Sequence, residues 1–212
     1  FLTKPKVIDN ISWYNRMSAP SHVRKAVVVG ASKVGKSTAM EKAEGRDYGA
    51  DYRQTIGVDF HSIYKSDGGE NKKMHAWDIG GSPQFREIGL PYMKTASMIV
   101  LMYDISRVVT LDELMHWHKI WSSLGRGRPI LVVGNCADKH DQCYGAGRAF
   151  ARSISAPHII TSAKTGQGID EMVSAMFAMC DQVELMRLKD GAGDSLLGRK
   201  TGRAARFCCA IL

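Results

Sequence analysis

The residues with the clearest potential for chemistry form a glycine-rich segment, residues 30–37, whose sequence is GASKVGKS. It fits the pattern G-x-x-x-x-G-K-[ST], in which the glycines let successive backbone N–H groups turn towards phosphate oxygens. Lys36 adds a positive charge for those oxygens, and the Ser37 hydroxyl is the kind of oxygen ligand that Mg²⁺ prefers. The segment therefore predicts a phosphate-binding loop, called the P-loop below. A chance glycine-rich turn is the alternative.

A second group of polar residues indicates which base accompanies the phosphates. Asn135 and Asp138 lie in the sequence GNCAD, at the end of an apolar run. A carboxylate at this place can accept two hydrogen bonds from the N–H edge of guanine, and adenine lacks such an edge. Asp138 therefore favours a guanine nucleotide over an adenine nucleotide.

The elements that must position these residues follow from the alternation of apolar and helix-forming segments. Short β-branched or apolar runs predict six strands, at residues 26–30, 58–66, 72–78, 98–103, 130–134 and 158–161. Segments of helical composition lie at residues 36–44, 85–94, 111–124, 145–153 and 169–188. An Asp-Gly-Gly turn predicts a hairpin between the second and third strands. This order predicts an α/β fold with a six-stranded, mostly parallel sheet and helices on both faces, whose ligands bind at the carboxyl ends of the strands.

Length and composition predict one domain with two tails. The chain has 212 residues, 44% of them hydrophobic, which suffices for one ordinary core. We expect an N-terminal extension at 1–22, a nucleotide-binding domain at 23–188 and a mobile basic tail at 189–212. No run approaches the roughly 18 apolar residues of a membrane-spanning helix, and the N-terminus lacks the layout of a signal peptide. We therefore expect a cytoplasmic protein.

The positive charge of the chain is concentrated near its C-terminus. The formal net charge is +8, and residues 187–206 contain six basic side chains against two acidic ones. Such a tail suits an anionic membrane or an acidic protein partner. Nucleic acid is the weaker interpretation, because no aromatic residues alternate with the basic ones and no zinc-finger spacing accompanies them.

The cysteines indicate lipid attachment rather than cross-linking. The five cysteines include no CxxC pair, which argues against a zinc site or a disulfide framework and predicts reduced thiols. Cys209 begins the last four residues, CAIL, which fit a C-a-a-X box whose final leucine favours geranylgeranylation. Cys208 offers a second lipid site, and the basic tail adds attraction to an anionic surface. An unstructured apolar end is the alternative.

Beyond the sixth predicted strand, residues 161–164 read TSAK, and with this motif the chain resembles the Ras-like small GTPases over about residues 24–186. The resemblance implies the P-loop GTPase fold, GTP or GDP as the nucleotide, and Mg²⁺. It also implies that the Ala163 backbone N–H meets the guanine carbonyl oxygen and that the stem of Lys164 covers the ring. Three further segments are similar to signatures of the Rab branch: IGVDF at 56–60, WD at 77–78 and LMYDIS at 101–106.

The resemblance also identifies two segments as switches that respond to the γ-phosphate. Residues 51–60 look like the first switch region, in which Thr55 coordinates Mg²⁺ only when the γ-phosphate is present. Tyr48 would stack edge-on against the base. In the second region, Asp78 would hold Mg²⁺ through a water molecule, and the Gly81 N–H would reach the γ-phosphate. Loss of that phosphate would release both segments.

Motifs and resemblance together give the candidate site residues. Those expected to bind the nucleotide are Ser32, Lys33, Val34, Gly35, Lys36, Ser37, Thr38, Tyr48, Thr55, Gly81, Asn135, Asp138, Ser162, Ala163 and Lys164. The expected Mg²⁺ ligands are Ser37, Thr55 and Asp78. The residues considered for catalysis are Lys36, Thr55, Gly81, Ser82 and Gln84, and the expected lipidation sites are Cys208 and Cys209.

The chain departs from the family at a position that matters for turnover. The family's second switch usually begins DTAGQ, whereas residues 78–84 read DIGGSPQ, so Ser82 replaces the glutamine that orients the attacking water. Gln84 lies two positions later and would need a shifted loop to substitute for it. We therefore expect slow hydrolysis that depends on an activating protein.

Two further departures concern nucleotide binding. Lys33 stands where the family usually has glycine, and Cys136 stands where the family's Asn-Lys-x-Asp motif has its lysine. In the family these two positions touch. We therefore hypothesise that Lys33 supplies, from the P-loop side, the ammonium group that is missing at Cys136. The alternative is two independent losses that weaken nucleotide binding.

The predicted function is that of a Rab-like GTPase, a GTP/GDP switch in vesicle or membrane traffic that cycles to the cytosolic face of an intracellular or plasma membrane. A GTP-binding scaffold with negligible turnover is the alternative. An ATP-using kinase is disfavoured by Asp138 and Thr55. The expected partners are an exchange factor, an activating protein, effectors at the switch regions, a prenyltransferase and a solubilising chaperone, with no nucleic acid.

Overall fold

The computed structural model describes residues 24–47, 49, 53–67, 70–124, 127–139 and 144–194. The predicted extension at 1–22 and residues 195–212 of the predicted tail lie outside this part of the chain, as does Tyr48. The same holds for the proposed lipidation sites, Cys208 and Cys209. None of the described helices is both long enough and apolar enough to cross a membrane.

The sheet has six strands, in the order β2-β3-β1-β4-β5-β6. Their bounds are Arg24–Val29 (β1), Val58–Asp67 (β2), Glu70–Ile79 (β3), Met98–Asp104 (β4), Ile130–Asn135 (β5) and His158–Ile160 (β6). All neighbouring pairs are parallel except β2 and β3, which form the predicted antiparallel hairpin at one edge. The prediction of a mostly parallel six-stranded sheet is therefore confirmed.

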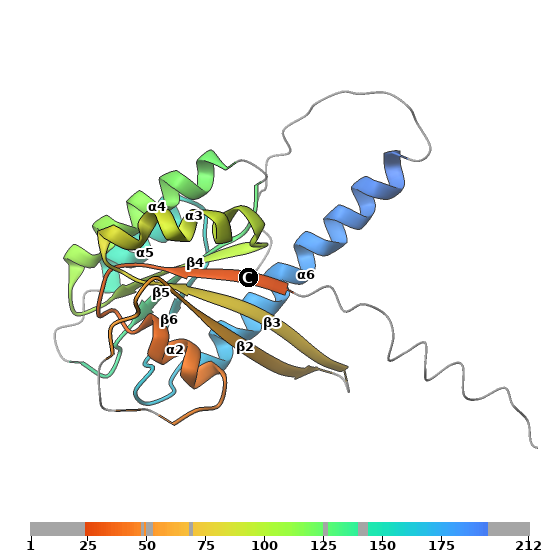
Figure 1. Cartoon of the computed structure of the whole chain (residues 1–212). Helices are drawn as coiled ribbons and strands as arrows, with labels where there is room; N and C mark the ends of the chain where they lie inside the picture. The colour runs from red at the N-terminus through yellow and green to blue at the C-terminus, as the bar shows by residue number, and fades with distance from the viewer. Residues whose placement is uncertain are drawn as a thin grey trace, which may run out of the picture.

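Helices cover both faces of the sheet, as predicted (Figure 1). Two of them, α2 (Lys36–Ala43) and α6 (Ile169–Asp194), pack on one face. The other face carries α3 (Arg86–Thr95), α4 (Leu111–Ser123) and α5 (Tyr144–Ser153). All seven residues of β4 are buried, because alternate side chains of a central strand enter opposite cores.

Helix α6 extends beyond the predicted boundary at residue 188. It continues to Asp194, so the first residues of the predicted mobile tail are helical. The prediction gave weight to Gly191 and Gly193, but a glycine inside a helix costs only about 1 kcal/mol relative to alanine. Extending an established helix is favourable, so two glycines do not end it. In Figure 1 the last turns of α6 project beyond the sheet.

The parallel strands bring the predicted motifs to one end of the sheet. Gly30 follows β1, Asp104 ends β4, Asn135 ends β5 and Thr161 follows β6. At Gly30 the P-loop leaves the sheet so close to β4 that an added Cβ atom would lie 2.0 Å from the Met102 carbonyl oxygen. The glycine is therefore required where the loop begins.

The buried side chain of Arg128 connects the C-terminal end of α3 to the loop before β5. Arg128 is 7% exposed, and its Nη1 donates to the carbonyl oxygens of Met93 at 2.8 Å and Ala96 at 2.6 Å. The guanidinium carbon lies 3.9 Å from the centre of the Trp121 ring. The side chain thus satisfies carbonyl groups at the C-terminal end of α3, where cations are stabilising.

Replacing Arg128 with methionine should lower the free energy of unfolding by about 3 kcal/mol, because the apolar stem remains but two charge-assisted hydrogen bonds are lost. Urea unfolding followed by circular dichroism measures this difference. The matched control is Arg148→Met on the exposed face of α5, which should change stability little. Equal midpoints for the two variants would contradict the role of Arg128.

Candidate nucleotide site

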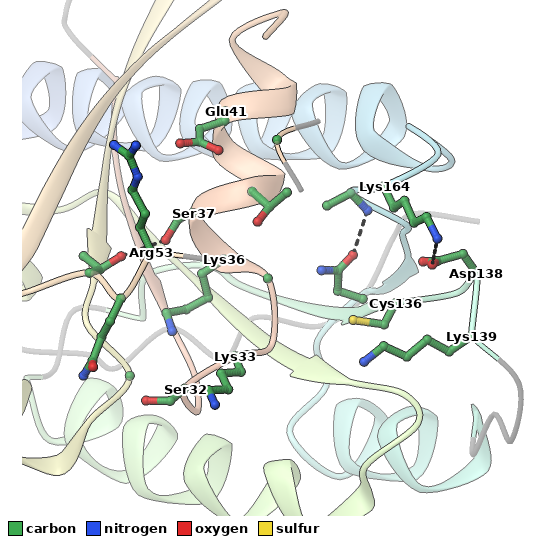
Figure 2. A pocket seen from close by; sticks show the side chains of 18 residues that line it. Ser32, Lys33, Lys36, Ser37, Glu41, Arg53, Cys136, Asp138, Lys139 and Lys164 are labelled. Carbon is green, nitrogen blue, oxygen red and sulfur yellow. Dashed lines mark hydrogen bonds and ion pairs between the residues drawn. The ribbon is translucent and has the colours of Figure 1, made fainter. Parts of the chain in front are cut away.

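A cavity of about 660 Å³ opens at the carboxyl ends of the strands, where ligands of this kind of sheet bind (Figure 2). The P-loop, the start of α2, the segment before β2 and the loops after β5 and β6 surround it. The predicted nucleotide-binding residues that line it are Ser32, Lys33, Gly35, Lys36, Ser37, Thr38, Thr55, Gly81, Asn135, Asp138, Ala163 and Lys164. The structure thus brings together residues from all the predicted motifs.

The P-loop end of the cavity carries positive charge. Helix α2 begins at Lys36, directly after Gly35, which has a φ of 85°. The Lys36 side chain is buried, and its ammonium group donates to the carbonyl oxygens of Gly30 at 3.1 Å and Ala31 at 3.0 Å. Burial lowers the pKa of Lys36. A helix N-terminus beside a desolvated cation suits an anionic phosphate group.

Oxygen ligands converge beside this phosphate end. The fully buried carboxylate of Asp78 accepts a hydrogen bond from the Ser37 hydroxyl at 2.5 Å, and the Thr55 hydroxyl lies 2.8 Å from that of Ser37. Burial raises the pKa of Asp78, and no group in the described part of the chain hydrogen-bonds its Oδ1. Two hydroxyls and a carboxylate with an unpaired oxygen fit Mg²⁺.

At the opposite end of the cavity lies Asp138, the residue predicted to bind the base. The Ser162 hydroxyl donates to Asp138 Oδ1 at 2.6 Å. Ser162 itself does not line the cavity, so it orients the Asp138 carboxylate. Lys164 Nζ lies 4.0 Å from the other carboxylate oxygen. Figure 2 shows Lys36 and Ser37 at one end of the cavity and Asp138 and Lys164 at the other.

Asn135 connects the loops around the base end. Its Nδ2 donates to the Val34 carbonyl oxygen at 2.9 Å, which gives Val34 a structural role below the cavity. Its Oδ1 accepts hydrogen bonds from the Thr161 hydroxyl at 3.0 Å and from the Ala163 N–H at 3.1 Å. The Ala163 N–H is therefore bonded to Asn135 in this structure, and its predicted bond to the guanine oxygen stays a prediction.

Lys33 and Cys136, the two departures from the family's binding motifs, line the same cavity. Both have left-handed backbone conformations, with φ values of 62° and 71°. The Cys136 sulfur lies 4.0 Å from the carbonyl oxygen of Val34, the residue after Lys33, so the loops that carry the two positions are in contact. Burial raises the pKa of the Cys136 thiol to about 11, which keeps it protonated at neutral pH. The compensation itself stays a prediction.

The residues considered for catalysis differ in position. Gly81 approaches the P-loop so closely that an added Cβ atom would lie 2.4 Å from the Ser32 nitrogen. The Ser82 hydroxyl lies 3.3 Å from that of Ser32. Gln84 is exposed and does not line the cavity. Pro83 starts a short 3₁₀ turn, η1 (Pro83–Phe85), whose buried residue is Phe85. The catalytic role considered for Gln84 stays a prediction.

A charged group that the sequence motifs did not predict lies beside the cavity. The fully buried carboxylate of Asp104 accepts hydrogen bonds from Lys139 Nζ at 2.8 Å and from Arg107 Nε at 2.9 Å. Another Arg107 nitrogen donates to the Lys33 carbonyl oxygen at 2.8 Å. Burial alone would raise the pKa of Asp104, but hydrogen bonds from Lys139, Ser106 and Arg107 lower it to about 2. One carboxylate thus holds the P-loop and the base loop together.

The sequence did contain a signal for this group. Arg107 and Lys139 directly follow the segments LMYDIS and GNCAD, so each predicted motif ended one residue too early. Lys139 also lines the cavity.

Replacing Arg107 with methionine should speed the release of bound guanine nucleotide about three- to tenfold, because the P-loop loses its tie to Asp104 and a charge-assisted hydrogen bond is worth ~1.5 kcal/mol or more. Displacement of a fluorescent GDP analogue measures the rate. Lys139→Met should also speed release, and the double variant should show less than the sum of the two effects. Unchanged release in both single variants would show that the Asp104 group does not hold the loops.

Comparison with known proteins agrees with this geometry. Residues 25–182 match the family described as the Ras family. The chain is 30% identical over 161 residues to the Ras-related protein Rab-19 of Mus musculus, covering 72% of each chain. It is 29% identical over 153 residues to the Ras-related protein SEC4 of Saccharomyces cerevisiae, covering 71% of each chain. It is 27% identical over 179 residues to the Ras-related protein Rab-4 of Dictyostelium discoideum, covering 82% of this chain and 85% of that protein. The chain therefore belongs to the Ras-like small GTPases, within their Rab branch.

Proposed function

We propose that this protein is a Mg²⁺-dependent GTP/GDP switch in intracellular vesicle or membrane traffic. The observation that carries the proposal is the position of Thr55, whose hydroxyl lies beside Ser37 and Asp78 at the phosphate end of the cavity. The conformation of a segment anchored there depends on whether a γ-phosphate is present, as in order-to-disorder switches. When bound, Mg²⁺ would neutralise phosphate charge, with Ser37, Thr55 and Asp78 as the residues that hold it.

Contacts between the two switch segments support a joint response. The Gly80 N–H donates to the Gly57 carbonyl oxygen at 2.8 Å, and a Cβ atom on Gly80 would lie 2.7 Å from the Thr55 carbonyl oxygen. Each segment therefore supports the other at close range. A change at the phosphate end that releases one segment removes packing from the second.

Slow hydrolysis is the second part of the proposal. The Ser82 side chain is two carbons shorter than glutamine, so its hydroxyl falls short of the place where a glutamine amide would act. Turnover would depend on an activating protein, and an exchange factor would open the site. A GTP-binding scaffold with negligible turnover is the second candidate, and Ser82 is the observation that favours it. Intact GTP recovered after hours of incubation would select the scaffold.

An exposed apolar surface beside the first switch supports effector binding there. Ile56 is 82% exposed and Phe60 is 48% exposed. The Phe60 ring lies 6.0 Å from that of Trp77, which lies 5.8 Å from that of Tyr92. This aromatic row joins the first switch to α3, so an effector bound to it would sense both switch segments.

Replacing Asp138 with alanine should weaken GDP binding at least about 100-fold, because two N–H groups of the base lose a charged acceptor worth ~1.5 to 3 kcal/mol for each bond. Competition of GDP and ADP against a fluorescent nucleotide measures the loss and the base preference. Asp112→Ala, on the exposed first turn of α4, is the control. Unchanged GDP affinity in Asp138→Ala would remove the base assignment.

Replacing Cys209 with serine should move the protein from membranes to the soluble fraction of cells without changing nucleotide affinity, because a thioether-linked lipid needs this sulfur. Fractionation of cells that express a tagged chain measures the distribution. Cys143→Ser serves as the control for the loss of a thiol elsewhere. Continued membrane association of the Cys209 variant would show that the lipid is not attached at that residue.

A further inference from the structure

Side chains from three separate segments meet at one point beside the cavity. Gln54 directly precedes Thr55, and its Nε2 donates to the Ser82 hydroxyl at 3.0 Å. The Ser82 hydroxyl in turn lies 3.3 Å from that of Ser32 in the P-loop. The first switch, the second switch and the P-loop are therefore linked through Gln54, Ser82 and Ser32.

This point lies at the phosphate end of the cavity. Gln54 and Ser32 line the cavity, as do Lys36 and Ser37, which mark that end. Figure 2 shows Ser32 on the same side as Lys36 and away from Asp138. A group at this place faces the terminal phosphate of a nucleotide whose base lies at Asp138.

From this geometry we infer that Gln54 supplies the carboxamide that position 82 lacks, and that it orients the water that attacks GTP. The water oxygen bonds to the γ-phosphorus while the bond to the β–γ bridging oxygen breaks. That electron pair leaves with GDP, and the proton of the water passes to the released phosphate. The inference rests on the proposed GTPase function.

The two ends of the Gln54 carboxamide have different tasks. Its Nε2 is fixed on Ser82, which limits the orientation of the group. Within the described part of the chain no donor is bonded to its Oε1, so this oxygen is available to accept a proton of the water. Ser82 is then a positioning residue: it is too short to hold the water, but it holds the amide that does. Positioning of this kind contributes to rate without adding affinity.

The test uses full-length protein preloaded with GTP and measures single-turnover hydrolysis. Gln54→Ala should be at least about tenfold slower than the wild type, because misplacing a reacting group costs ~10- to 100-fold. Gln182→Ala, on the exposed side of α6, is the control of equal chemistry. The double variant Gln54→Ala with Ser82→Gln should regain the wild-type rate or exceed it, because it returns a carboxamide to the site.

A second measurement separates positioning from folding or binding. GDP release from Gln54→Ala should equal that of the wild type, whereas binding of GDP with aluminium fluoride, which imitates the transferring phosphoryl group, should weaken about tenfold. A wild-type or faster hydrolysis rate in Gln54→Ala would overturn the inference, as would equal loss of GDP binding and hydrolysis. Slower turnover in Gln84→Ala alone would assign the role to that residue instead. No hydrolysis in the wild type would overturn the proposed GTPase activity as well, which distinguishes the two failures.

Discussion

Asn135 ends β5 with a side chain that is only 1% exposed, and its amide joins segments that are far apart in the sequence. The nitrogen binds the P-loop at Val34, and the oxygen binds Thr161 and Ala163 beyond β6. Removing this amide would leave several buried polar groups without partners, each at a cost of ~1 to 3 kcal/mol. The Asn135 amide therefore fixes the position of the P-loop relative to the loops after β5 and β6. The spacing between the two ends of the cavity depends on it.

A second tie uses charge instead of an amide. Asp104 is buried at the end of β4 and holds Arg107 and Lys139, which reach the P-loop and the base loop from below. The segment around Thr55, at the phosphate end of the cavity, is held less firmly than the loops tied by Asn135 and Asp104. Gln54 and Ile56 are exposed around Thr55, and hydrogen bonds between side chains hold this segment. The proposed switch function requires this combination of a buried, densely bonded half and an exposed, lightly held half.

Motifs at strand ends were predictable because their chemistry is local in sequence. The P-loop fixes its own geometry through Gly30 and Gly35, and the parallel sheet then brings Asp138 to the same edge. The motifs placed Arg107 and Lys139 next to predicted site residues, but their shared partner Asp104 was not predictable, since the two cations become neighbours only after folding. The contact on which the proposed role of Gln54 rests was missed for the same reason, because its partner Ser82 lies 28 positions away.

The end of α6 and the loop position of Gln84 show what residue type alone does not predict. Helix α6 passes residue 188 because extending an established helix is favourable and outweighs the small cost of an interior glycine. Gln84 was considered for catalysis because it lies two positions from Ser82; it follows Pro83 in the 3₁₀ turn and does not line the cavity, and its catalytic role stays a prediction. Both features depend on the local backbone conformation, which residue type alone does not predict.

If the cavity selects a guanine nucleotide through Asp138 and holds it by the P-loop, the protein should retain such a nucleotide through purification. Acid releases the copurified nucleotide, and ion-exchange chromatography identifies it. We expect GDP or GTP at close to one molecule per chain. Copurified adenine nucleotide, or purified protein that binds ATP as tightly as GTP, would contradict this expectation.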